Sequence, residues 1–160
     1  FLHSSRFDQR YNKKLMILDI LYATVTGNAE MVAKKLKELA IKDGFVVNLN
    51  EMNFHNINTF KQLRSVAIIT STYGDGDVPE MGLDFWEELN SSNDKLPNMK
   101  YGLIALGDRS HEEFCGAGRK ISKKLEKLEA NKIIKNLECD GDTEGSYEWS
   151  LDFLEKLKKL

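Results

Sequence analysis

The sequence predicts an α/β domain with a doubly wound, five-stranded parallel sheet in the order 2-1-3-4-5 and helices on both faces. Two observations predict this fold. Apolar runs alternate with amphipathic stretches along the whole chain, and Gly, Ser, Thr and Asp residues gather directly after the apolar runs. Five strand–helix pairs in succession need right-handed crossover connections, and such connections make the strands parallel. We therefore expect a ligand site beyond the carboxyl ends of the strands.

Five short runs are the expected strands. Continuous apolar character over a few residues, bounded by turn residues, is typical of strands buried on both faces. The runs are residues 16–23, 45–49, 66–71, 101–106 and 132–137.

Helices are expected between these runs. Residues 29–42 place Val32, Leu36, Leu39 and Ala40 at helical spacing, with lysines between them. Further helices are expected around residues 85–89, over residues 113–129 and over residues 148–160, whereas residues 54–64 are expected to be a loop with one helical turn.

Length and composition indicate how many domains the chain forms. The 160 residues, 41% apolar and 30% charged, suit a single domain, which we expect over residues 16–160. Residues 1–15 lack periodicity and are expected to be a tag, a linker or a disordered segment.

Composition also excludes several classes of function. Cys115 and Cys139 do not stand in a CxxC motif or at the Cys/His spacing of a metal site, so the sequence indicates neither a zinc site nor a disulfide framework. We expect both thiols to be reduced, which favours a cytoplasmic location. A net charge of −2 argues against nucleic-acid binding. No apolar run approaches the ~20 residues that cross a bilayer.

The first loop joins a strand to a helix and suits an anion. It consists of Thr24, Val25, Thr26, Gly27, Asn28 and Ala29. Hydroxyl groups, a glycine and the N–H groups of a helix end can together hold a phosphate. The loop lacks both GK[ST] and GxGxxG, so a single phosphate monoester fits better than a triphosphate or a pyrophosphate. An ordinary turn with a Thr or Asn cap is the alternative.

The second and third loops carry one ring each. The second contains Ser71, Thr72, Tyr73, Gly74 and Asp75, and the third contains Leu106, Gly107, Asp108, Arg109, Ser110, His111, Glu112, Glu113, Phe114 and Cys115. Tyr73 beside two glycines suits a platform for a flat ligand, although a plain turn is the alternative. A lone histidine is usually a surface or cap residue, but with Tyr73 it suggests a clamp on one planar ring.

The three loops, TVTGNA, STYGDGDVPE and LGDRSHEEFCGAG, resemble the FMN-binding loops of the flavodoxin family. The likeness covers residues 16–160 and is greatest to the FMN domains of diflavin reductases, such as sulfite reductase flavoprotein, and to MioC-like flavodoxins. The chain is similar to the short-chain members, because the fifth strand has no long insertion.

This resemblance implies the function and the roles of the site residues. The first loop would hold the FMN phosphate, the other two would line the isoalloxazine, and Asp140 would lie close to the cofactor. Tyr73 would stack on one face, and the peptide at Gly74 would turn its carbonyl toward flavin N5 on reduction. The implied function is single-electron transfer between a reductase and an acceptor protein, as a free carrier or as the FMN domain of a larger oxidoreductase.

One position departs from the family pattern. Relatives usually have a tyrosine where this chain has His111. Because a protonated imidazole attracts an anionic reduced flavin, we expect the second reduction step to be easier and more pH-dependent than in tyrosine relatives. Phe114 is the alternative cover for that face of the flavin.

Charge indicates the partners. Acidic residues crowd the expected cofactor end, namely Asp75, Asp77, Glu80, Asp84, Glu87, Glu88, Asp108, Glu112, Glu113, Asp140, Asp142 and Glu144. We expect this acidic face to guide a basic face of an NAD(P)H-dependent reductase and of a redox acceptor, with the chain itself a monomer. The alternatives are an FMN-dependent NAD(P)H:quinone reductase on the same fold and a flavin-free protein-interaction module.

Overall fold

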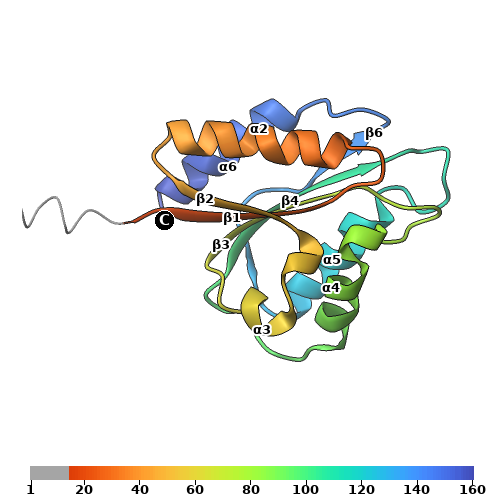
Figure 1. Cartoon of the computed structure of the whole chain (residues 1–160), viewed down its shortest axis with the longest axis horizontal. Helices are drawn as coiled ribbons and strands as arrows, with labels where there is room; N and C mark the ends of the chain where they lie inside the picture. The colour runs from red at the N-terminus through yellow and green to blue at the C-terminus, as the bar shows by residue number, and fades with distance from the viewer. Residues whose placement is uncertain (1–14) are drawn as a thin grey trace, which may run out of the picture.

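The computed structural model describes residues 15–160, so the expectation for residues 1–15 falls almost wholly outside the described part. A parallel sheet lies between two layers of helices (Figure 1). The strand order is β2-β1-β3-β4-β5, with β6 also paired to β4, which confirms the predicted topology. The strands are β1 Ile17–Ala23, β2 Val46–Glu51, β3 Ser65–Thr70, β4 Lys100–Gly107, β5 Asn131–Lys132 and β6 Leu137–Asp140.

The helices cover the sheet in two groups. Helices α2 and α6 lie on one face, and α3, α4 and α5 lie on the other (Figure 1). Their bounds are α2 Asn28–Lys42, η1 Met52–Phe54, α3 Ile57–Phe60, α4 Glu80–Ser91, α5 Gly116–Lys127 and α6 Ser146–Lys158. Helix α5 begins three residues later than predicted, because Cys115 before it adopts a left-handed conformation with φ 53°.

The fifth strand differs from the prediction. The sequence predicts a continuous strand over residues 132–137, but the chain pairs with β4 in two pieces, β5 and β6, and leaves the sheet between them. The indole N–H of Trp149 donates to the carbonyl of Lys135 at 3.0 Å, and the amide of Asn136 donates to Ser122 Oγ at 3.0 Å. The bond from Trp149 satisfies a backbone carbonyl that is outside the sheet, and the bond from Asn136 anchors the same segment by its side chain. Both bonds are tertiary contacts, so the local sequence pattern does not predict them.

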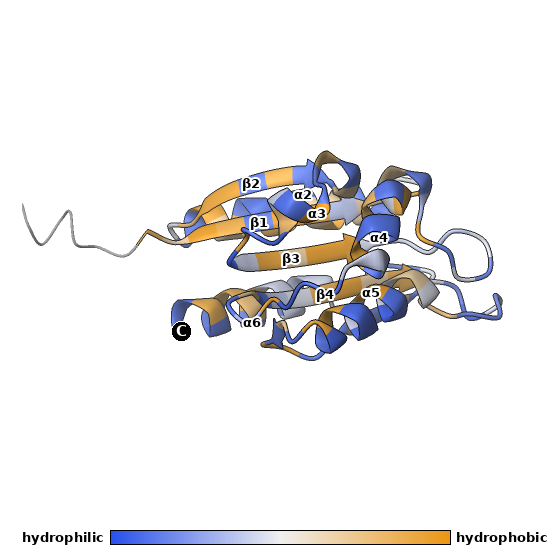
Figure 2. Ribbon diagram, turned by 90° about the horizontal axis from the view of Figure 1, so that it is seen from below, coloured by the Kyte–Doolittle hydropathy of each residue, from blue (hydrophilic) through white to orange (hydrophobic). Residues whose placement is uncertain are grey.

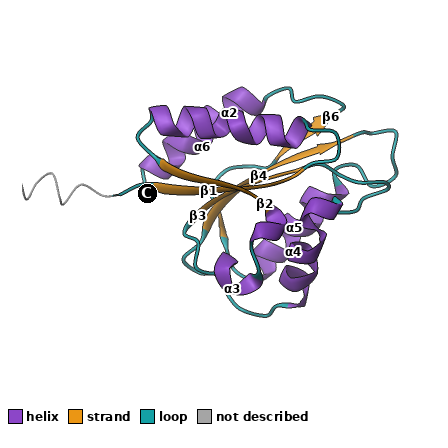
Figure 3. Ribbon diagram, in the orientation of Figure 1, coloured by secondary structure: helices purple, strands orange, loops and turns teal. Residues whose placement is uncertain are grey.

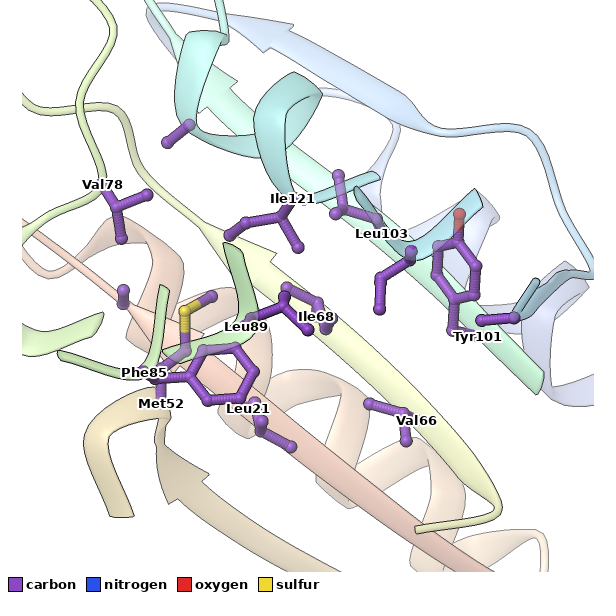
Figure 4. Packing of buried hydrophobic residues seen from close by; sticks show 14 of the residues in the cluster. Leu21, Met52, Val66, Ile68, Val78, Phe85, Leu89, Tyr101, Leu103 and Ile121 are labelled. Carbon is purple, nitrogen blue, oxygen red and sulfur yellow. The ribbon is translucent and has the colours of Figure 1, made fainter. Parts of the chain in front are cut away.

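The core has two halves because side chains alternate along the central strands. On β1, Leu18 and Ile20 face α2 and α6, whereas Leu21 and Ala23 face the other helix layer. Figure 2 shows the strands as the most hydrophobic part of the chain, with hydrophilic residues on the outer helix surfaces. Figure 4 shows the half under α4 and α5, where Phe85 and Leu89 of α4 lie toward Leu21 of β1 and Ile68 of β3. Burial on both faces explains the continuous apolar runs.

Helix α5 lies very close to β4. A Cβ atom on Gly118 would lie 2.5 Å from the Cβ of Ala105, so this position has no room for a side chain. The close approach holds the third loop, which connects β4 to α5, directly against the end of the sheet. Over residues 15–160 no helix has the combination of length and hydrophobicity that a membrane crossing needs.

Both thiols are expected to be unreactive in the folded protein. Cys115 is fully buried and Cys139 is 2% exposed. Burial raises the pKa of Cys115 to about 12 and that of Cys139 to about 11. Because the thiolate is the nucleophile, iodoacetamide at pH 8 should label neither cysteine in the native state and both in guanidinium. Intact-mass spectrometry measures this, with glutathione in the same tube as the reactive control. Labelling of either residue in the native protein would contradict the buried placement.

Candidate functional site

The three predicted loops meet at one end of the sheet. Figure 3 shows them as the loops that follow β1, β3 and β4. They enclose an open cleft of about 260 Å³. Its lining is Val25, Thr26, Asn28, Ser71, Thr72, Gly74, Leu106, Gly107, Asp108, His111, Glu113, Gly141 and Asp142. Eleven of these thirteen residues are among the predicted site residues. The sequence therefore located the cleft through its strand ends.

The first loop presents an open helix end. Gly27 has φ 101°, and its N–H donates to Thr24 Oγ1 at 2.8 Å, which holds the turn in shape. No side chain of residues 15–160 caps the first turn of α2. The Thr or Asn cap that the alternative of an ordinary turn expects is thus absent here, and the Thr24 hydroxyl accepts a hydrogen bond within the loop instead. The N–H groups of Asn28 and Ala29 begin a helix whose positive dipole end faces the cleft, which suits an anion.

The second loop contributes a hydroxyl without a partner. Thr72 Oγ1 is buried and has no hydrogen-bond partner among the described residues. A buried polar group is rarely left unpaired in a protein, so a ligand atom is the natural partner here. The loop itself is well held, because Tyr73 and Asp77 exchange backbone hydrogen bonds of 2.7 and 2.8 Å. A Cβ on Gly76 would lie 2.5 Å from that of Glu113, so the second and third loops touch.

The two predicted rings do not line the same cavity. His111 lines the cleft, with its Nδ1 3.8 Å from a carboxylate oxygen of Asp75. Tyr73, 59% exposed, instead lines a neighbouring groove of about 760 Å³ together with Val25 and Trp86. The two-sided clamp therefore stays a prediction, and it requires a ligand that reaches past Val25, which borders both spaces.

The third loop is held by charged side chains. Asp108 accepts hydrogen bonds from the N–H and the hydroxyl of Ser110 at 2.8 and 2.7 Å, and these lower its pKa. Asp140, at the end of β6, accepts from the backbone N–H of Arg109 at 3.0 Å. The Arg109 guanidinium lies 4.3 Å from the centre of the Phe114 ring. Asp140 thus holds the loop through both the backbone and the side chain of Arg109.

Some predicted residues lie outside the cleft lining. Ala29, Phe114 and Cys115 are buried at 0%, 8% and 0% exposure. Phe114 lies under two guanidinium groups, those of Arg109 and Arg119, so it does not cover the cleft as the alternative proposed. The remaining predicted residues outside the lining of this cleft are Thr24, Gly27, Tyr73, Asp75, Arg109, Ser110, Glu112 and Asp140.

Sequence reasoning missed two residues of the cleft. Gly141 and Asp142 follow β6 and line the cleft beside His111. The same signal that marked the other loops, a glycine and an aspartate directly after a strand, was present here. The sequence predicts that the fifth strand ends at residue 137, whereas β6 ends at Asp140, so Gly141 directly follows a strand only in the structure.

The residues present fit FMN. An uncapped helix end and neutral hydroxyls suit a phosphate, the unpartnered Thr72 hydroxyl suits a polar atom, and His111 offers an aromatic face. The cleft is smaller than the 300–1,000 Å³ typical of pockets that enclose a ligand. A bound flavin would therefore extend to the surface, which leaves an edge open to electron transfer.

Comparison with known proteins decides the family. The sequence profile described as Flavodoxin matches residues 20–153, which include all three loops. The chain belongs to the flavodoxin family. Membership implies FMN as the cofactor and supports an electron-transfer role, with the flavin supplying the redox chemistry.

The relatives of this flavodoxin domain are of two kinds. The sulfite reductase [NADPH] flavoprotein alpha-component of Photobacterium profundum is 38% identical over 89% of this chain and 24% of its own length. The Bacillus subtilis protein of the same description is 33% identical over 81% of this chain and 22% of its own length. The chain thus spans about a quarter of these curated relatives.

Solved structures of small flavodoxins match over nearly their whole length. A Streptococcus pneumoniae TIGR4 flavodoxin has a TM-score of 0.78 at 27% identity, with 89% of this chain and 98% of the other covered. A short-chain flavodoxin associated with a PDU bacterial microcompartment has a TM-score of 0.79 at 26% identity, with 91% and 98% covered. The short-chain architecture predicted from the fifth strand agrees with these matches.

Proposed function

We propose that this flavodoxin domain binds FMN non-covalently in the cleft and passes single electrons between a reductase and an acceptor protein. The observation that carries the proposal is the convergence of an uncapped helix end, the unpartnered Thr72 hydroxyl and the His111 ring on one open cleft. The site offers a phosphate socket, a polar contact and an aromatic contact in one place. Catalytic acids or bases are not needed, because the cofactor carries the electrons.

The residues divide into three binding roles. The N–H groups at the start of α2 and the Thr26 hydroxyl hold the phosphate, whose negative charge the helix end favours. Thr72 and Gly74 approach the ring from the second loop, and His111 contacts it from the third. Gly74 has φ 53°, a conformation that glycine adopts without strain, so its peptide can change orientation at low cost.

The partners are proteins with a basic face. Asp108, Glu113 and Asp142 line the cleft, and exposed Asp75 and Glu112 lie on the same loops. These carboxylates would guide a positively charged surface to the open edge of the flavin. Because the curated relatives are about four times longer, the domain serves either as a free carrier or as the FMN module of a longer oxidoreductase.

A stepwise reduction tests this function. The protein is incubated with FMN, desalted and reduced with dithionite while its absorption spectrum is recorded. A one-electron carrier should retain flavin and take up its two electrons in two resolved steps. A single two-electron step, together with direct oxidation of NAD(P)H, would favour the quinone reductase. Protein that retains no flavin would leave only the protein-interaction module.

His111→Tyr should change how the potential depends on pH. A protonated imidazole beside an anionic reduced flavin is attractive, and a phenol cannot supply that charge. We expect the second reduction potential of the variant to be lower and its slope against pH to be shallower. Spectroelectrochemistry of the two FMN-loaded proteins measures both quantities. Asp75→Asn is the matched control, because it removes the carboxylate 3.8 Å from the ring and leaves the imidazole in place. Identical potentials and slopes in wild type and His111→Tyr would refute the expectation.

A further inference from the structure

A second groove lies between helices α4 and α5, on the sheet face that carries both (Figure 1). It has a volume of about 300 Å³. Trp86 and Asn90 line it from α4, and Lys120, Lys123, Lys124 and Lys127 line it from α5. The residues to which we assign FMN binding are not among them, although Trp86 and Lys120 also line the neighbouring groove beside Tyr73.

The positive charges of this groove are largely unpaired. Lys120 lies 3.6 Å from a carboxylate oxygen of Asp77. Among residues 15–160, the ammonium groups of Lys123, Lys124 and Lys127 form no hydrogen bond or ion pair. Lys124 is only 9% exposed as a whole residue, but its ammonium nitrogen is not buried, so the aliphatic stem is packed and the charge reaches the groove. Four ammonium groups with one carboxylate close to them leave the groove with an excess of positive charge, which suits an anion.

Helix stability does not account for these lysines. Their spacing of three and four residues places them as neighbours on one side of α5, where like charges repel. The helix dipole favours Lys124 and Lys127, which lie in or near the last turn, but it offers nothing to Lys120 and Lys123. Pairing within the helix and the helix dipole therefore do not account for all four charges.

The α4 side of the groove adds an aromatic wall and an amide. Trp86 is half-buried, and neither its indole N–H nor the amide of Asn90 has a hydrogen-bond partner among the described residues. An indole stacks well on a flat heterocycle, and an amide can donate and accept along the edge of one. The groove thus combines a surface for a ring with charges for a phosphate group.

We propose that the groove between α4 and α5 binds a nucleoside di- or triphosphate, with the base on Trp86 and the phosphates among the four lysines. A small ligand can lie within the groove, where the Trp86 ring and the ammonium groups of Lys123, Lys124 and Lys127 line one space. Phosphate oxygens inside the groove can accept from Lys124 directly.

Calorimetry on the FMN-loaded full chain tests this proposal. ADP and ATP are titrated at low and at physiological salt, with adenosine and inorganic pyrophosphate as partial ligands. We expect both nucleotides to bind, each partial ligand to bind at least about tenfold more weakly, and the affinity to fall with salt. Lys124→Met keeps the aliphatic stem and removes the charge, and it should weaken ADP at least about tenfold.

Two comparisons give the test its specificity. Lys37→Ala/Lys42→Ala on α2 removes two charges far from the groove and should leave ADP binding unchanged. Trp86→Ala should weaken ADP but not pyrophosphate, and Trp86→Phe should restore most of the loss. The proposal is overturned if nucleotides give no heat at low salt, if pyrophosphate binds as well as ADP, or if the α2 variant loses as much as Lys124→Met. Flavin binding is unaffected by any of these outcomes, so they are distinct from failure of the proposed electron carrier.

Discussion

Replacing Thr26 with glutamate is expected to lower the affinity for FMN about a hundredfold. Thr26 lines the cleft beside the uncapped start of α2, where we place the phosphate. Two like charges 4 Å apart repel by about 4 kcal/mol at intermediate dielectric, and solvent at this exposed loop reduces that figure. A remaining penalty of about 2.8 kcal/mol corresponds to a factor of a hundred. Quenching of FMN fluorescence on titration with apoprotein measures the change.

Thr26→Ser is the matched control, because it keeps the hydroxyl and the loop. We expect this variant to bind FMN within a few-fold of the wild-type affinity. A second control uses riboflavin, which lacks the phosphate, and Thr26→Glu should bind it as the wild type does. If Thr26→Glu lost FMN and riboflavin equally, the loop would be disturbed as a whole and the assignment of the phosphate site would be wrong.

Phe85→Ala is expected to lower the free energy of unfolding by about 3–5 kcal/mol. Phe85 is 1% exposed, and its ring packs edge-on against Phe60, with centroids 4.9 Å apart and planes at 73°. Truncation removes this aromatic contact and leaves a cavity that the sheet and helix backbones cannot close. Urea denaturation followed by circular dichroism measures the loss.

Phe54→Ala provides the control, since the same chemical change is made at a ring that is 70% exposed on η1. Its effect should stay within about 0.5 kcal/mol, as for other surface substitutions. A loss below about 1 kcal/mol for Phe85→Ala would mean that the core under α4 tolerates a void, contrary to its packing.

Hydrophobic pattern and loop chemistry were sufficient for most of the fold. The apolar runs that became β1, β3 and β4 are buried on both faces, and this is the arrangement that continuous apolar sequence favours. The hydrophobic pattern could not predict the division of the fifth strand into β5 and β6, because the indole N–H of Trp149 donates to the carbonyl of Lys135 between them. Residues 14 positions apart form that bond, and no short window contains both.

The sequence by itself determined the strand order, the family and the three loops, because each depends on local patterns that recur at strand ends. Only the tertiary structure decided which residues share the cleft: it added Gly141 and Asp142, placed Phe114 under Arg109, and put Tyr73 in the neighbouring groove. It alone also brought Trp86 of α4 beside the lysines of α5. The reason is physical, since a helix exposes several faces and only its packing against the sheet selects the one that meets a neighbour.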